Sequence, residues 1–246
     1  RVRRERDRFV GFVLDGVERI PARDKLIGYA RFVGPNALEV TGADGAVGHR
    51  VEFGRAVIAT GSSPDVPQAL RAAGDRLVIN DDVFDWDDLP ASVAVFGPGV
   101  IGLELGQALH RLGVAVHVFG RGGRVGPFQD AALQDYARRT LAAEFPLHPD
   151  ARDVAVSRDG DGVEVHFTEH GQAQSVRVEY VLAATGRTPN VRGLGLERTG
   201  LELDARGIPL FDRHTLQCGD SHIFIAGDAN ADLPLLHEAA DEGRIA

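Results

Sequence analysis

Cysteine and methionine are nearly absent from this sequence of 246 residues, which has one cysteine, Cys218, and no methionine. A single cysteine excludes a disulfide or a C-x-x-C metal or redox motif within these residues. Acidic residues outnumber basic ones by 36 to 27, and the resulting formal charge of −9 disfavours a nucleic-acid partner. No apolar run approaches the roughly 20 residues that span a bilayer. From these absences we expect a cytoplasmic protein with no membrane or nucleic-acid partner and no metal.

The ends of the sequence are unusual. It begins with Arg1 instead of a methionine, and it stops inside a helical pattern that starts near Leu235. We therefore expect the chain to be part of a longer polypeptide. Its 43% hydrophobic and 26% charged content is that of a globular protein. Thirty glycines and twelve prolines suit an α/β protein with many short turns.

The periodicity of apolar residues predicts the order of elements. A helix is expected over residues 1–18, followed between 27 and 60 by a three-stranded antiparallel meander with breaks at 34–36 and 42–45. A strand at 91–96, a helix at 100–112 and a strand at 114–119 form a βαβ unit. Beyond it we expect a helix at 129–144, strands at 153–157, 162–168, 175–184 and 222–228, and a helix from about 235.

A glycine-rich turn opens the helix of this βαβ unit. Gly97, Gly99 and Gly102 form G-x-G-x-x-G directly after the strand. In dinucleotide-binding folds the first glycine permits a tight turn, the second admits a pyrophosphate, and the third lets the helix lie close to the strand. Free N–H groups and the helix dipole then favour the phosphate charge. The motif in this context predicts a dinucleotide site.

The end of the second strand of such a unit normally decides between NAD and NADP. An acidic side chain there binds the ribose 2′-hydroxyl, whereas arginine accommodates a 2′-phosphate. Here Gly120 takes the acidic position, and Arg121 and Arg124 follow it. Guanidinium groups match phosphate in charge and geometry. We favour NADP over NAD, the alternative being that both arginines are ordinary surface residues.

Three further stretches lie in a fixed order around this motif: VIATGSSP at 57–64, LAATGRTPN at 182–190 and IFIAGDANAD at 223–232. Together they resemble the pyridine nucleotide-disulfide oxidoreductases, most closely the branch of dihydrolipoamide dehydrogenase and mercuric reductase. The resemblance implies an α/β flavoprotein with two Rossmann-like, three-layer domains, FAD- and NAD(P)-binding, and an antiparallel meander. The NAD(P) domain, residues 89–215, is inserted in a partial FAD domain made of residues 1–88 and 216–246.

The resemblance assigns residues to the nicotinamide nucleotide. Gly97, Gly99, Val100, Ile101 and Gly102 line it, and Glu104 lies near the contact between nicotinamide and flavin. Gly186 and Arg187 form a second turn on this side, and Val154 matches a position beside the adenine. Gly102 argues against a preference for NADP, because some NADP-preferring relatives have alanine at this position. Glu104 could instead be a solvated residue on the helix.

Other residues are assigned to FAD. Thr60 and Gly61 lie at the crossover into the inserted domain. Gly227 and Asp228 end the last strand, where the aspartate binds the ribityl chain or phosphate of the flavin. Leu235, Leu236 and His237 lie where backbone N–H groups meet the flavin ring. Asp228 could instead cap its loop, His237 is given no chemistry, and Cys218 is interpreted as a small buried hydrophobe.

Several parts of the family pattern are missing. The sequence has no C-x-x-x-x-C redox pair, no FAD-binding glycine turn before the meander, and no dimerisation domain with its acid–base pair. We therefore assign no catalytic residue and expect weak FAD binding or none. The parent is interpreted as an enzyme passing hydride between nicotinamide and FAD, and electrons to or from a disulfide substrate, as a homodimer. The alternatives are a flavoprotein without a redox disulfide, of the NADH oxidase or ferredoxin reductase type, or an inactive nucleotide-binding module.

Overall fold

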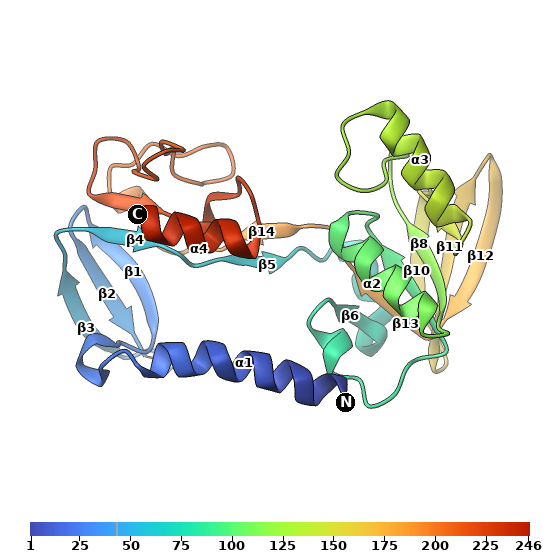
Figure 1. Cartoon of the computed structure of the whole chain (residues 1–246), viewed down its shortest axis with the longest axis horizontal. Coiled ribbons are helices and arrows are strands. Elements are labelled where there is room, and N and C mark those ends of the chain that lie inside the picture. The colour runs from blue at the N-terminus through green and yellow to red at the C-terminus, as the bar shows by residue number, and fades with distance from the viewer. Residues whose placement is uncertain (43) are drawn as a thin grey trace. The chain divides into compact units, whose positions relative to one another are not determined.

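The computed structural model describes residues 1–42 and 44–246, without the side chain of Val47; Ala43, in the predicted break at 42–45, lies outside the described residues. The chain forms two compact units (Figure 1). The first unit comprises Arg1–Arg8 and Pro64–Arg187, and the second comprises Phe9–Ser63 and Thr188–Ala246. The chain therefore passes between units near residues 8, 63 and 187, whereas the predicted domain bounds were 88/89 and 215/216.

A five-stranded parallel sheet forms the centre of the first unit. Its order is β6-β13-β7-β8-β9, with β6 at Leu77–Ile79, β13 at Tyr180–Ala183, β7 at Ser92–Phe96, β8 at Ala115–Phe119 and β9 at Leu147–His148. From β7 the chain continues outward through β8 to β9, and then returns to β13 on the other side of β7. This reversal of strand order is the hallmark of a doubly wound α/β fold.

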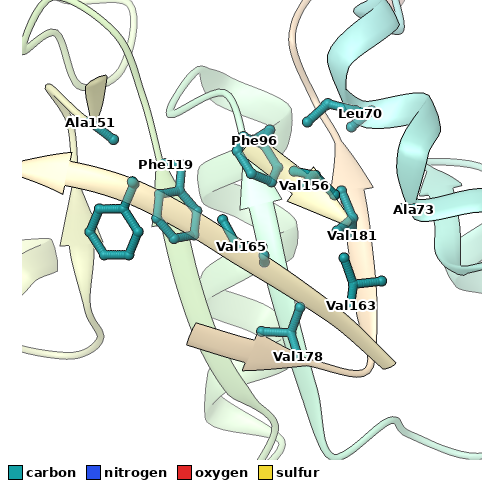
Figure 2. Close-up of a cluster of buried hydrophobic side chains, with 13 residues drawn as sticks. Leu70, Ala73, Phe96, Phe119, Ala151, Val156, Val163, Val165, Val178 and Val181 are labelled. Atoms are coloured by element: carbon teal, nitrogen blue, oxygen red, sulfur yellow. The ribbon is translucent and has the colours of Figure 1, made fainter. Parts of the chain in front are cut away.

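Two further layers cover this sheet, as alternating side chains on its strands require. Val93 and Val95 pack on the side of helices α2 (Val100–Arg111) and α3 (Ala131–Ala142). On the opposite face, Phe96 and Phe119 pack with valines of the antiparallel sheet β10-β11-β12 (Figure 2). These strands span Arg152–Asp159, Gly162–Glu169 and Gln172–Val178. The prediction of Rossmann-like, three-layer architecture is confirmed for this unit.

The predicted single strand at 175–184 is wrong, because two strands of different sheets share it. β12 ends at Val178 and pairs with β11, whereas β13 begins at Tyr180 in the parallel sheet. At Glu179 the backbone N–H donates to the Ser92 carbonyl, 3.1 Å away, where the chain enters the second sheet. Apolar residues alternate without a break through Val176, Val178, Tyr180 and Leu182, so periodicity could not reveal the change of layer. The sequence also predicted no element at 68–88, where 3₁₀ helices lie at Gln68–Arg76 and Asp82–Asp85 beside β6.

The second unit contains the predicted meander, with β1 at Tyr29–Gly34, β2 at Ala37–Thr41 and β3 at Val47–Glu52. The residues that follow leave it: β4 (Ala56–Ile58) pairs in parallel with β15 (Ile223–Ile225). Cys218 is fully buried beside these strands, and burial raises the pKa of its thiol to about 12. It is therefore a core residue, as predicted.

The remaining elements are two helices, a pair of short strands and three single turns. α1 (Val2–Glu18) confirms the first predicted helix, and α4 (Leu236–Ile245) the last. β5 (Ser62–Pro64) pairs with β14 (Arg187–Pro189) where the chain passes between units. Single 3₁₀ turns lie at Ala22–Asp24, Leu196–Arg198 and Gly227–Asn230. In the described part of the chain, no helix has both the length and the apolar character needed to cross a bilayer.

A histidine pair in the first unit makes stability depend on pH. Nδ1 of His117 lies 3.3 Å from Nε2 of His148, and Nδ1 of His148 lies 2.8 Å from a Glu169 carboxylate oxygen. Burial, and secondarily the charge of His148, lower the pKa of His117 below 6.5. The unfolded chain therefore binds a proton here before the folded chain does, and the free energy of unfolding falls as pH drops through about 6.5.

We expect the melting temperature to fall less between about pH 7.5 and about pH 5.5 in His117→Phe than in the unmodified chain. The exposed His49 provides the control variant His49→Phe, which should follow the unmodified chain. Thermal unfolding followed by circular dichroism measures all three. Superimposable pH profiles for His117→Phe and the unmodified chain would contradict the assignment.

Candidate functional site

One cleft of about 490 Å³ lies in the first unit at the carboxyl ends of β7, β8 and β13. It spans the point where strand order reverses, between β7 and β13, which is where open α/β sheets bind their ligands. Its wall is partly aromatic and aliphatic, and Phe96 stacks on Phe119 with 5.1 Å between ring centroids (Figure 2). The lining comprises Pro67, Ala69, Leu70, Phe96, Gly97, Pro98, Gly99, Phe119, Gly120, Arg121, Arg124, Gly126, Val154, Ala184, Thr185 and Gly186.

Packing requires two of the three motif glycines. Gly97 has a left-handed φ of 107°, and a Cβ on it would overlap the carbonyl oxygen of Ala184 in the neighbouring loop. A Cβ on Gly102 would overlap the carbonyl oxygen of Gly97. Gly99 differs: its φ is −84°, and a Cβ there would meet nothing within 4 Å. It lines the cleft, so its missing side chain keeps that space open.

Helix α2 begins at this turn with unpaired amide groups. Gly99 is its N-cap residue and gives no side-chain cap, and the N–H of Leu103 donates to the Gly99 carbonyl at 3.0 Å. The N–H groups of Val100, Ile101 and Gly102 precede this bond and have no intrahelical acceptor. With the helix dipole they form an anion site beside the cleft. None of these three residues is in the cleft lining, and Glu104 is exposed one turn further on.

Two arginines give the cleft positive charge. Arg121 and Arg124 are exposed and line it on the loop that follows β8. Arg124 donates two long hydrogen bonds, both of 3.4 Å, to the Phe128 carbonyl and to Gln129. Across residues 1–42 and 44–246, no carboxylate forms an ion pair with either guanidinium. Both therefore remain able to bind an anion in the cleft.

Other predicted residues of the nucleotide side divide into two groups. Gly186 and the partly buried Val154 line the cleft, whereas Arg187 lies outside the lining at the start of β14. The Gly186 turn is held by Asp65, whose N–H donates to the Gly186 carbonyl at 2.9 Å. Pro67 and Leu70 also line the cleft. Leu70 lies in the 3₁₀ segment Gln68–Arg76, and Pro67 directly precedes it. Sequence reasoning missed both, because a 3₁₀ segment does not follow the 3.6-residue period of an α-helix.

The residues predicted for the flavin gather in the second unit, at the carboxyl ends of β4 and β15. Thr60 and Gly61 follow β4, and Gly227 and Asp228 follow β15. The hydroxyl of Ser62 donates to Asp228 Oδ2 at 2.6 Å, joining the two strand ends. This role of Ser62 could not be predicted from the sequence, because Ser62 and Asp228 are 166 positions apart and only the pairing of β4 with β15 brings them together.

Helix α4 lies against the same turn through Ala239 and Glu242. Leu235 is the N-cap residue without a side-chain cap, and Leu236 is 90% exposed. His237 is exposed, with Nε2 3.8 Å from a Glu238 carboxylate oxygen. Glu242 of α4 accepts from the Gly227 N–H at 2.6 Å and so fixes the helix to the Gly-Asp turn. The structure thus brings together the strand ends that carry Thr60, Gly61, Gly227 and Asp228, and Leu235, Leu236 and His237 begin the helix that packs on this turn.

Comparison with known proteins gives one consistent family. The family model described as pyridine nucleotide-disulphide oxidoreductase matches residues 22–243. A dihydrolipoyl dehydrogenase of Vibrio cholerae is 30% identical over 95% of this chain and 49% of the relative. A Mycobacterium tuberculosis NAD(P)H dehydrogenase (quinone) is 34% identical over 94% of this chain and 46% of the relative. This chain thus spans about half the length of these relatives.

Solved structures agree with this match. The crystal structure of LpdA from Mycobacterium tuberculosis has 33% identity and a TM-score of 0.75, covering 89% of this chain and 48% of that one. The flavoprotein disulfide reductase RclA from Escherichia coli has a TM-score of 0.82 and covers 99% of this chain and 55% of that one. At 21% identity, RclA supports the fold alone.

Proposed function

Since the chain belongs to the pyridine nucleotide-disulphide oxidoreductase family, whose members are enzymes that use FAD and NAD(P), we propose that its first unit binds a nicotinamide adenine dinucleotide. The observation that carries this proposal is the turn of Gly97, Gly99 and Gly102 at the cleft. Packing excludes side chains at Gly97 and Gly102, and Gly99 leaves open space beside the uncapped end of α2. This arrangement suits a pyrophosphate at the helix N-terminus, with the apolar wall against the adenine.

We further propose that the cleft prefers NADP to NAD. Arg121 and Arg124 line it without ion-pair partners among the described residues, and Gly120 provides no carboxylate for a ribose 2′-hydroxyl. A 2′-phosphate would be bound by charge-assisted hydrogen bonds. Gly102 does not oppose this preference here, because the Gly97 carbonyl already excludes alanine at that position.

For FAD the fit is partial. Asp228 and the N–H groups at the start of α4 suit the flavin end of the cofactor, and Thr60 and Gly61 lie beside them. The sequence has one G-x-G-x-x-G turn, however, and that turn belongs to the first unit. The chain therefore offers FAD no comparable cradle for its pyrophosphate. We propose that these residues contribute to a flavin site, and that the 246 residues alone bind FAD weakly.

The proposed reaction of the longer polypeptide is oxidoreduction between a nicotinamide nucleotide, FAD and a dithiol or disulfide, in a homodimer. The bound cofactors supply hydride and electron transfer, and this chain's residues bind and orient them. The relative that reduces a quinone supports a second candidate, an acceptor other than a disulfide. A C-x-x-x-x-C pair elsewhere in the polypeptide, with activity on lipoamide and none on quinones, would exclude this second candidate.

Calorimetric titration of the chain with NADPH, NADH and FAD tests the binding proposal. We expect NADPH to bind more tightly than NADH, and FAD to bind weakly. Gly99→Val should weaken the binding of both nicotinamide nucleotides at least about tenfold, because the valine side chain would occupy the space left for the pyrophosphate. The control is Gly54→Val, at an exposed glycine with equally open surroundings in the second unit. Tight stoichiometric FAD binding, or nucleotide binding indifferent to Gly99→Val, would refute the corresponding proposal.

A further inference from the structure

Position 120 cannot hold a side chain in this fold. A Cβ built on Gly120 would lie 2.5 Å from Cγ of Pro98 and 2.9 Å from the carbonyl oxygen of Pro149. Real Cβ atoms do not approach heavy atoms so closely, so the exclusion is steric. The pyrrolidine ring of Pro98 is the nearer obstacle. It occupies the space beside the strand end where an acidic residue would reach a ribose 2′-hydroxyl.

Pro98 also holds the arginine loop. Its carbonyl accepts from the N–H of Gly126 at 2.7 Å, which closes the segment that follows β8. On the other side of this segment, the Gly122 N–H donates to an Asp150 carboxylate oxygen at 3.1 Å, and the Gly123 N–H donates to the Pro149 carbonyl at 3.0 Å. The backbone carrying the two cleft arginines is therefore fixed at several points, one of which is Pro98.

We propose that Pro98 is a specificity-determining residue of the nucleotide cleft. Its ring excludes a carboxylate at position 120, and its carbonyl fixes the loop that presents Arg121 and Arg124. The ligand class that fits is an adenine dinucleotide with a 2′-phosphate. This inference rests on the proposed nucleotide function and extends it to the second residue of the G-P-G turn.

The steric part is tested without nucleotide by a double-mutant cycle on thermal stability. Gly120→Ala should lower the melting temperature by about 5 °C in the unmodified chain, because the new methyl group meets the Pro98 ring. In the Pro98→Ala background the same change should cost less, because the nearest contact, at 2.5 Å from the Pro98 ring, is removed, while the 2.9 Å contact with the backbone carbonyl of Pro149 remains. Equal losses in both backgrounds would overturn the steric pairing.

The specificity part is tested by titrating Gly120→Glu, Pro98→Ala and the double variant with NADPH and NADH. Pro98→Ala is the background with which the double variant is compared. The double variant should shift the ratio of the two dissociation constants toward NADH by at least about tenfold, whereas Gly120→Glu alone should be destabilised and bind neither well. A stable Gly120→Glu variant that prefers NADH would overturn the inference while leaving nucleotide binding intact. An unmodified chain that binds neither nucleotide would instead overturn the proposed function.

Discussion

Gly97→Ala is expected to lower the free energy of unfolding of the first unit by about 3 kcal/mol or more. Two costs combine at this position. The φ of 107° is one that residues with a Cβ rarely adopt, and the added methyl group would overlap the Ala184 carbonyl. The two loops cannot separate freely, because the Gly97 N–H donates to Phe119 and the Ala184 N–H donates to Phe96, each at 2.8 Å.

Urea unfolding followed by tryptophan fluorescence measures this loss in the relevant unit. Trp86 is the single tryptophan of the chain, and it lies in the first unit with its ring 5.4 Å from that of Tyr180. Gly99→Ala is the matched control in the same turn. Its backbone is extended and its surroundings are open, so stability should change by less than about 0.5 kcal/mol. Similar losses in both variants would mean that the turn is not packed as described.

Arg121→Ala is expected to weaken NADPH binding by about 10- to 100-fold, which corresponds to the loss of about 1.5–3 kcal/mol from hydrogen bonds to a charged group. NADH binding should change little, because NADH has no 2′-phosphate. Calorimetric titration with both nucleotides, at two salt concentrations, distinguishes a specific contact of Arg121 with the 2′-phosphate from general electrostatic attraction to the ligand. The difference in affinity between NADPH and NADH should be smaller in the variant than in the unmodified chain, and smaller at high salt than at low salt.

Arg206→Ala provides the matched control. It removes one positive charge from an exposed arginine of the second unit, which is paired with Asp204 at 3.2 Å. This variant should bind both nucleotides like the unmodified chain. If Arg121→Ala weakened NADPH and NADH equally, the arginine would act on the shared part of the ligand, and the proposed 2′ preference would be refuted.

The glycine turn could be predicted from sequence because its reasons are local. A strand, a turn and a helix follow each other within residues 91–112, and in this context the spacing of Gly97, Gly99 and Gly102 indicates the geometry. The same holds for the Gly-Asp end of the last strand. Whether these residues contact the cofactors assigned to them stays a prediction, but the structure places Gly97 and Gly99 at a cleft and Asp228 beside Ser62.

Features that depend on distant residues could not be predicted in this way. The contact between Pro98 and Gly120 requires β7 and β8 to be neighbours, and the sequence suggested only that an acidic residue was missing at 120. The structure shows in addition that a Cβ at position 120 would overlap the Pro98 ring and the Pro149 carbonyl oxygen. Similarly, Val178 and Tyr180 lie in different sheets although the pattern between them is continuous. An alternating pattern indicates which residues face a core, but it does not indicate which of two sheets they belong to.

Amide NMR spectra of the chain titrated with NADP⁺ test the central claim most directly. The account predicts that the largest shifts fall on the amides of Val100, Ile101 and Gly102 and on the loop from Arg121 to Arg124. The amide signals of residues in the second unit, such as Asp228, should not shift. Shifts concentrated in the second unit, or no shifts at millimolar NADP⁺, would contradict a dinucleotide site in the cleft at the start of α2.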